Sequence, residues 1–199
     1  MKMYLFFGTV GSGKTLELLK MAMSYRRRGK KILLLTSSVD NRNGVGKIST
    51  RFGSEYLSKE IGNEFGIQED ALLIEKMENL KGFVEKNNYE HILCDEVQFF
   101  RIQDIDALVE VVTELNVPVS CFGLKSNYKG ELFDSMAHLI VFADKIQEVK
   151  TSCYACDRKA VLNLRVHNGE PVYEGDEIYV GGQDNYLPAC REHWFYPRL

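Results

Sequence analysis

The chain has 199 residues, of which 27% are charged and 45% are apolar, and its formal net charge is −3. These values predict a folded globular protein with one domain, or one domain plus a small appendage. The negative charge argues against bulk electrostatic binding to nucleic acid or to an anionic membrane. No apolar run approaches a membrane span, and the first residues, MKMYLFFG, lack the layout of a signal peptide. We therefore expect a cytoplasmic protein.

Apolar runs and helically spaced apolar residues alternate along the chain. Continuous apolar runs predict buried strands at 3–7, 31–36, 71–74, 91–94 and 117–123. Helical spacing predicts helices at 14–28, 77–87, 104–115 and 132–143. Gly29 is expected to cap the first of these helices. This order of elements predicts an α/β fold with a parallel sheet that helices cover on both sides.

Two polar segments interrupt this pattern. Residues 37–54, SSVDNRNGVGKISTRFGS, show no clear period and predict a long flexible loop, and loops of this length are often functional. The run RRRGKK at 26–31 resembles a nucleic-acid-binding patch, but its cations also complement the dipole at a helix C-terminus. We prefer the second interpretation because the whole chain is acidic, and nucleic-acid binding is the alternative.

The segment GTVGSGKT at 8–15 matches the G-x-x-x-x-G-K-[ST] pattern of a phosphate-binding P-loop. It lies between a predicted strand and a predicted helix, which is the context that the pattern requires. In such a loop, backbone N–H groups surround the phosphates, Lys14 supplies positive charge and Thr15 offers a hydroxyl to Mg²⁺. The segment predicts a bound nucleoside triphosphate and a P-loop NTPase-like domain. It leaves open whether water, a small molecule or nothing accepts the γ-phosphate.

Two acids, Asp95 and Glu96, follow the predicted strand at 91–94. An acid at a strand end beside a P-loop is the usual second group that holds Mg²⁺, and Asp95 fits that role. Glu96 would project toward the ligand crevice, where a carboxylate can take a proton from an attacking hydroxyl or polarise a water. The alternative is a pair of solvated turn residues. The pair does not by itself distinguish a kinase from an ATPase.

The composition changes near Lys150, after which short β-like runs and a turn at His167-Asn168-Gly169 follow. We therefore divide the chain into a P-loop α/β domain at 1–149 and a small β-rich domain at 150–199. Of the five cysteines, Cys94 and Cys121 lie in apolar runs of the first domain and are expected to be buried thiols. The other three cysteines lie in the second domain, where a metal site is more plausible than disulfides in a cytosolic chain.

The second domain contains two knuckle-like pairs of metal-ligating residues, whose members are Cys153, Cys156, Cys190 and His193. Three thiolates and one imidazole make a closed tetrahedral set for structural Zn²⁺. His167 is a competing fourth ligand, but it lacks a partner at this spacing. Zinc would tie the ends of a loop that includes EGDEIYVGGQDNY at 174–186, whose glycines and tyrosines suit a planar base. A plain zinc-stapled hairpin is the alternative.

The P-loop, DEVQFF at 95–100, GLKSNYKGELF at 123–133 and the Cys-x-x-Cys…Gly-Gly-x-x-x-Tyr…Cys-x-x-His tail occur together and in that order. This set resembles the type II, zinc-containing thymidine kinase family, and most closely its bacterial members. The resemblance implies transfer of the γ-phosphate of ATP to the 5′-hydroxyl of thymidine or deoxyuridine, with Mg²⁺, in nucleotide salvage. It also implies a homotetramer, a zinc-binding lasso domain and dTTP as a feedback inhibitor.

The resemblance also implies roles for individual residues. It makes Glu96 the general base and places Lys14 and Arg51 at the phosphates as catalytic groups. The positions that it assigns to ATP binding are Gly8, Thr9, Val10, Gly11, Ser12, Gly13, Lys14, Thr15, Ser49, Thr50, Arg51, Asp95, Glu96, Val97 and Gln98. The positions that it assigns to the nucleoside are Val10, Phe100, Leu124, Tyr128, Phe133, Glu177, Ile178, Tyr179, Val180, Gly181 and Tyr186. It assigns Mg²⁺ to Thr15 and Asp95, and Zn²⁺ to the four residues of the two knuckle-like pairs.

Three positions depart from the family's pattern. Val10 stands where members usually carry a Met that packs near the thymine methyl, so the pocket is expected to differ in shape. Tyr128 stands where Phe is common and adds a hydroxyl, which needs a partner if it is buried. Thr15 replaces the usual Ser but keeps the hydroxyl for the metal.

Two other classes of protein compete with a nucleoside kinase. A P-loop ATPase with a zinc-ribbon nucleic-acid-binding module would also combine these motifs, although residues 150–199 are close to charge-balanced rather than basic. A regulator that senses nucleotides such as dTTP without consuming ATP is the non-enzymatic alternative.

Overall fold

The computed structural model describes residues 2–40, 44–51, 66–175 and 185–199. Its centre is a parallel sheet of six strands in the order β5-β2-β6-β7-β1-β8. In chain order the strands are β1 (Met3–Phe7), β2 (Ile32–Thr36), β5 (Leu72–Leu73), β6 (His91–Cys94), β7 (Val119–Gly123) and β8 (Lys145–Glu148). Parallel strands buried on both faces need continuous apolar runs, which the inner strands of this sheet have.

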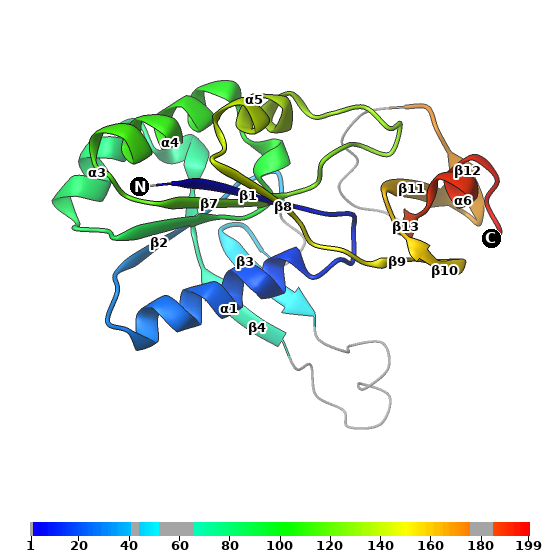
Figure 1. The fold of residues 1–199 in the computed structure, drawn as a ribbon, viewed down its shortest axis with the longest axis horizontal. Coiled ribbons are helices and arrows are strands. Elements are labelled where there is room, and N and C mark those ends of the chain that lie inside the picture. Colours follow the sequence, from blue (N-terminus) through cyan, green and yellow to red (C-terminus); the bar gives the residue numbers. More distant parts are fainter. Residues whose placement is uncertain (1, 41–43, 52–65, 176–184) are drawn as a thin grey trace.

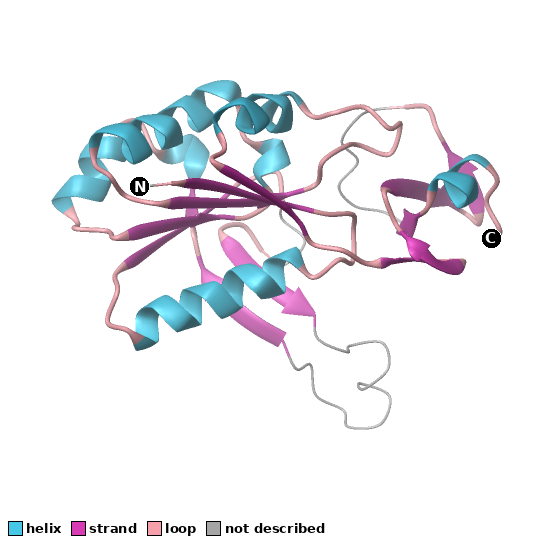
Figure 2. Ribbon diagram, viewed as in Figure 1, coloured by secondary structure: helices cyan, strands magenta, loops and turns pink. Residues whose placement is uncertain are grey.

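Helices cover both faces of the sheet (Figures 1 and 2). One face carries α3 (Leu80–Lys86), α4 (Ile102–Glu114) and α5 (Asp134–Phe142), and the other carries α1 (Lys14–Arg27). Short 3₁₀ turns follow β5 and β6, at Ile74–Lys76 and Val97–Phe99. The predicted α/β class with a helix-covered parallel sheet is therefore confirmed.

Alternate residues of the inner strands β1, β2, β6 and β7 enter two separate cores, as the two-residue period of a strand requires. In β6, Ile92 packs against α3 and α4, whereas Leu93 packs against Leu18 and Leu19 of α1. Gly29 follows α1 in the left-handed conformation, with φ +74°, and its N–H bonds to the carbonyl of Arg26 at 2.9 Å. The prediction that Gly29 caps this helix is therefore confirmed.

The expectation of a structureless loop at 37–54 is wrong in part. The strand β3 (Lys47–Arg51) lies in this segment and pairs antiparallel with β4 (Gly66–Asp70). Ile48 is buried against α1, which holds the hairpin on that side of the sheet (Figure 1). The partner strand is distant in sequence and has only one apolar residue, so no local pattern predicts the pair.

One smaller difference has a physical reason, and one preferred interpretation gains support. The sequence does not predict β8, because this edge strand reads Lys145-Ile146-Gln147-Glu148, and an edge position does not require an apolar run. The basic run at 26–31 is partly paired with acids, since Arg26 lies 2.6 Å from Glu69. This ion pair favours the interpretation of the basic run as a solvated helix end over its interpretation as a nucleic-acid-binding patch.

The described residues of the C-terminal segment, 150–175 and 185–199, lie beyond the carboxyl ends of the sheet strands (Figure 1). Its described elements are β9 (Ser152–Cys153), β10 (Cys156–Lys159), β11 (Leu162–His167), β12 (Glu170–Val172), β13 (Asn185–Ala189) and α6 (Arg191–Phe195). All of its strand pairs are antiparallel. Leu164, Val166 and Ala189 form its small core together with Trp194. Within the described residues, no helix combines the length and apolar character that a membrane crossing needs.

Candidate active site and metal centre

The P-loop connects β1 to α1 and depends on its glycines. Gly11 and Gly13 have φ values of +68° and +87°, a region that other residues rarely adopt. A Cβ atom on Gly8 would lie 2.4 Å from the carbonyl oxygen of Val149. The backbone can therefore take this path only with glycine at these positions, and the loop opens directly onto the N-terminus of α1, which favours anions.

Two polar side chains of the loop are buried. Lys14 is 8% exposed, and its ammonium group donates to the carbonyl of Thr9 at 2.8 Å. The buried hydroxyl oxygen of Ser12 has no hydrogen-bond partner among the described residues. Buried polar groups are normally satisfied, so an unpartnered hydroxyl in a P-loop indicates a position that a ligand completes.

Thr15 and Asp95 meet where the first turn of α1 faces the end of β6. The hydroxyl of Thr15 donates to Oδ2 of Asp95 at 3.0 Å, while Oδ1 of the same carboxyl group is buried without a described partner. Burial and the nearby charge of Glu96 raise the pKa of Asp95 to about 7, against the lowering effect of Thr15 and Lys14. Paired oxygen ligands with unsatisfied capacity fit a hard cation such as Mg²⁺.

Glu96 follows Asp95 in the left-handed conformation, with φ +52°. A non-glycine residue held in this region often marks a functional site. The side-chain amide of Gln98 donates to Oε2 of Glu96, and its Oε1 accepts from the N–H of Leu124 at 2.9 Å. The hydroxyl of Ser135 donates to the carbonyl of Gln98 at 3.0 Å. Gln98 therefore orients the Glu96 carboxylate and is itself fixed by two other segments.

The residues predicted to contact the nucleoside gather around the segment 124–133. Phe100 and Phe133 are buried, and Leu124 packs against the same core. Tyr128 is 1% exposed, and its ring lies 5.1 Å below the guanidinium of Arg165 and 6.4 Å from the ring of Tyr186. The indole N–H of Trp194 donates to the carbonyl of Tyr128 at 3.1 Å. The C-terminal segment thus packs directly on the segment 124–133.

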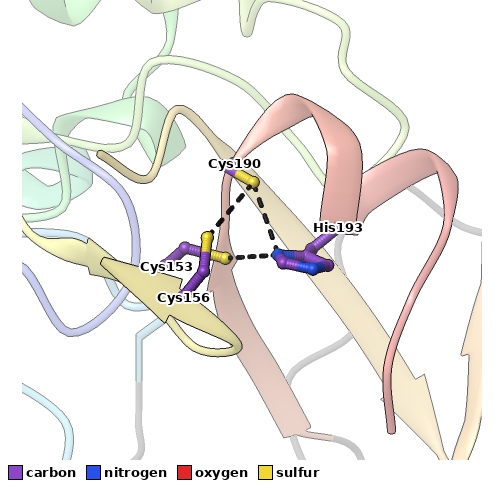
Figure 3. A group of neighbouring side chains, drawn as sticks. All are labelled: Cys153, Cys156, Cys190 and His193. Carbon is purple, nitrogen blue, oxygen red and sulfur yellow. Dashed lines mark hydrogen bonds between the residues drawn. The ribbon is translucent and has the colours of Figure 1, made fainter. Parts of the chain in front are cut away.

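Cys153, Cys156, Cys190 and His193 converge, with their ligand atoms within 4.8 Å of one another (Figure 3). Nδ1 of His193 lies 3.4 Å from Sγ of Cys153 and 3.5 Å from Sγ of Cys190. Burial opposes the thiolate of Cys153, but the N–H groups of Ala155 and Cys190 and the His193 ring lower its pKa to about 6. Three sulfurs and one imidazole nitrogen around a common point fit tetrahedral Zn²⁺. The exposed His167 is not part of this cluster.

The structure does not bring all predicted site residues together. Ser49 and Thr50 lie on β3, which packs beside α1, and within the described residues no hydrogen bond joins their side chains to the P-loop. Val97 is fully buried in the core beneath the end of β6. The side chain of Arg51 lies outside the described residues, as do Glu177, Ile178, Tyr179, Val180 and Gly181.

Two residues near the site were missed by the sequence patterns. Asn163 and Arg165 of β11 are 3% and 8% exposed, and both face the first 149 residues rather than solvent. A weak signal exists, because Leu162, Leu164 and Val166 alternate with polar residues. Such alternation normally means that the polar face is solvated. Only the structure shows that this polar face is covered.

Comparisons with known proteins identify the family of this chain. A family model described as "Thymidine kinase" matches residues 1–194. The thymidine kinase of Streptococcus gordonii is 42% identical, and the match covers 100% of this chain and 98% of the relative. That of Lactobacillus acidophilus is 39% identical, with 100% and 98% covered. A solved DNA replication initiation factor aligns with a TM-score of 0.42 and 13% identity over 74% of this chain and 39% of its own. The chain belongs to the thymidine kinase family.

Proposed function

We propose that this chain is an ATP-dependent thymidine kinase, which transfers the γ-phosphate of ATP to the 5′-hydroxyl of thymidine or deoxyuridine in nucleotide salvage. The observation that carries the proposal is the arrangement at the end of β6. There Asp95 meets Thr15 of the P-loop, and the neighbouring Glu96 is oriented by Gln98. A base beside a phosphate-binding loop suits an alcohol acceptor. Membership of the thymidine kinase family supports thymidine as that alcohol.

The triphosphate would bind at the P-loop. Its backbone N–H groups and the N-terminus of α1 favour anions, and Lys14 and Ser12 add a charge and a hydroxyl. Thr15 and Asp95 are the residues that would hold Mg²⁺. When bound with ATP, this ion neutralises charge that develops on the phosphates.

Glu96 is the general base in this proposal. Its carboxylate would accept the proton of the 5′-hydroxyl while that oxygen attacks the γ-phosphate. The role of Gln98 is to hold the carboxylate. Its side-chain amide is fixed by the N–H of Leu124, and its backbone carbonyl is fixed by the hydroxyl of Ser135. General-base catalysis by a positioned side chain typically contributes about 10²- to 10⁴-fold to the rate.

The nucleoside would lie between the segment 124–133 and the C-terminal segment. Tyr128, Tyr186 and the buried rings of Phe100 and Phe133 supply aromatic surface for a planar base. We assign the backbone of residues 177–181 to reading the base edges and Arg51 to the phosphates, on the basis of the family resemblance. Val10 would shape the floor of the pocket near the base.

We further propose that the chain folds as two domains, 1–149 and 150–199, and that Zn²⁺ in the second is structural. Its four ligands would leave no open coordination position for chemistry. The family resemblance also supports a cytoplasmic homotetramer that dTTP inhibits.

The direct test is a panel of nucleosides incubated with ATP and Mg²⁺, with detection of 5′-monophosphates. Thymidine and deoxyuridine should yield products, and purine nucleosides should not. Glu96→Gln keeps the shape of the side chain and should bind ATP normally while losing about two orders of magnitude or more in kcat. The absence of product from both pyrimidines would refute the proposal. Near-normal turnover by Glu96→Gln would refute only the role of that residue.

A further inference from the structure

Asn163 lies on the polar face of β11. Leu164 and Val166 point into the small core of the C-terminal segment, so the alternate residue Asn163 points the other way. Its side chain is nevertheless only 3% exposed. A side-chain amide at this burial must find partners for both its oxygen and its nitrogen, because an unpaired polar group is costly there.

Both partners belong to the backbone of the first 149 residues. The N–H of Val10 donates to Oδ1 of Asn163 at 2.9 Å, and Nδ2 of Asn163 donates to the carbonyl of Ser126 at 3.0 Å. A backbone N–H can only donate and a carbonyl can only accept, so these partners determine the orientation of the amide. One side chain thus joins the P-loop, the segment 124–133 and the C-terminal segment.

The bond to Val10 adds a constraint in the middle of the P-loop, where the N–H of Ser12 also donates to the carbonyl of Thr9 at 3.3 Å. Gly8, at the start of the loop, is held by its N–H bond to the carbonyl of Gly123 at 3.3 Å and by close contact with Val149. Lys14, at the end, is part of α1. Between them, a glycine-rich backbone has the largest conformational entropy to lose when it surrounds a ligand. A bond at Val10 removes part of that freedom before binding.

Asn163 is in turn held by the region around the candidate zinc site. The N–H of Val161 donates to the carbonyl of Ala189 at 2.8 Å, and Ala189 directly precedes the ligand Cys190. The N–H of Tyr154, next to the ligand Cys153, donates to the carbonyl of Pro188 at 2.7 Å. These hydrogen bonds therefore fix the strand that carries Asn163 beside the cluster of Cys153, Cys156, Cys190 and His193.

We propose that Asn163 is a positioning residue that preorganises the phosphate-binding loop by holding the N–H of Val10 from the C-terminal segment. Its contribution to nucleotide affinity rests on the proposed binding of ATP at the P-loop. Its effect on the loop itself does not, because both hydrogen bonds are made between groups of the protein. Preorganisation raises affinity by reducing the ordering cost of binding.

The first experiment is amide hydrogen exchange in the ligand-free, zinc-loaded protein. Asn163→Leu keeps the branching and the number of side-chain heavy atoms but removes both hydrogen bonds, and we expect exchange in residues 8–13 to become about tenfold faster. The matched control is Val166→Ala, which loosens the core on the opposite face of the same strand and leaves both bonds in place. It should leave P-loop exchange unchanged. Unchanged exchange in Asn163→Leu, or an equal increase in Val166→Ala, would overturn the proposal.

Calorimetric titration with Mg·ATP gives the functional readout. Asn163→Leu should raise Kd about tenfold at unchanged zinc content, whereas Val166→Ala should bind like the wild type. Wild-type affinity in Asn163→Leu would overturn the preorganising role. If the wild type itself binds no ATP, the proposed function fails, and the exchange result still decides whether Asn163 positions the loop.

Discussion

The hydroxyl of Thr15 and the carboxylate of Asp95 lie 3.0 Å apart, although 79 residues separate them in the sequence. This contact joins the helix that follows the P-loop to the strand that ends in the two acids. It also leaves one buried oxygen of Asp95 without a described protein partner. The pair is therefore the point at which a cation bound to a triphosphate would meet the protein.

We expect Thr15→Val to lower kcat/KM for Mg·ATP by about two orders of magnitude, because it removes a metal-facing oxygen while keeping the branched shape. Thr15→Ser is the matched control, since it keeps the hydroxyl, and should retain most of the activity. The measurement is steady-state kinetics at varied Mg·ATP with thymidine saturating. Equal activity in the two variants would show that the hydroxyl holds no ligand.

Gln98→Leu should lower kcat about tenfold and change the KM for Mg·ATP little. The reason is that Gln98 orients Glu96 and contacts neither the P-loop lysine nor Thr15 in the described structure. The control is the double variant that carries Gln98→Leu together with Glu96→Gln. Once the base is gone, loss of its orienting partner should cost nothing further, so additive losses in kcat would argue against this relationship.

Zinc analysis should find about one Zn²⁺ for each chain, since the four ligand atoms converge within 4.8 Å. Cys190→Ser should lose the metal and lower the thermal midpoint by about 10 °C or more, because metal binding and folding are coupled in small closed sites. Cys121→Ala removes a buried thiol outside the cluster and should keep the zinc. Metal retention in Cys190→Ser would contradict the assignment of the ligands.

Stability should fall in mild acid because of His91. This residue is 2% exposed, and burial, with a smaller effect from Arg28, lowers its pKa from 6.5 to about 4. The folded state therefore disfavours the protonated ring. The contribution of His91 to the free energy of unfolding is fully present above the unfolded-state pKa. It falls by up to ~3 kcal/mol as the pH drops from about 6.5 toward 4.

His91→Gln removes this titration and keeps a group that can reach Ser120, which lies 3.0 Å from the His91 ring. Chemical denaturation between pH 7 and pH 4 should therefore show a flatter dependence in His91→Gln than in the wild type. The control is His138→Gln, on α5, which should keep the acid-side loss. An unchanged slope in His91→Gln would show that other groups cause the loss.

Local sequence patterns were sufficient to predict those features that depend on residues close together in the chain. The strands at β1, β2, β6 and β7 follow from continuous apolar runs, and the four main helices follow from helical spacing. The P-loop could be recognised because its backbone path demands glycine at the pattern positions Gly8 and Gly13. The zinc ligands could be grouped because the residue types and their paired spacing are rare by chance.

Patterns were insufficient where a partner lies far away in the chain. The strand β3 depends on β4, and β8 depends on its edge position beside β1. Neither has an apolar run of its own, so neither can be predicted without the neighbour. A different limit hid Gln98 as the group that orients Glu96: the two residues are close in the chain, but a glutamine two residues after an acid is unremarkable in sequence.

The sequence by itself determined the fold class, the phosphate-binding loop, the paired acids and the four candidate zinc ligands, because these depend on residue types at short, fixed spacings. Only the tertiary structure decided that Thr15 meets Asp95, that Gln98 holds Glu96, and that Asn163 reaches the backbone of Val10. Each of the contacts with Thr15 and Asn163 joins segments that are distant in the chain. Their formation depends on how the sheet and the C-terminal segment pack, and no local pattern encodes that packing.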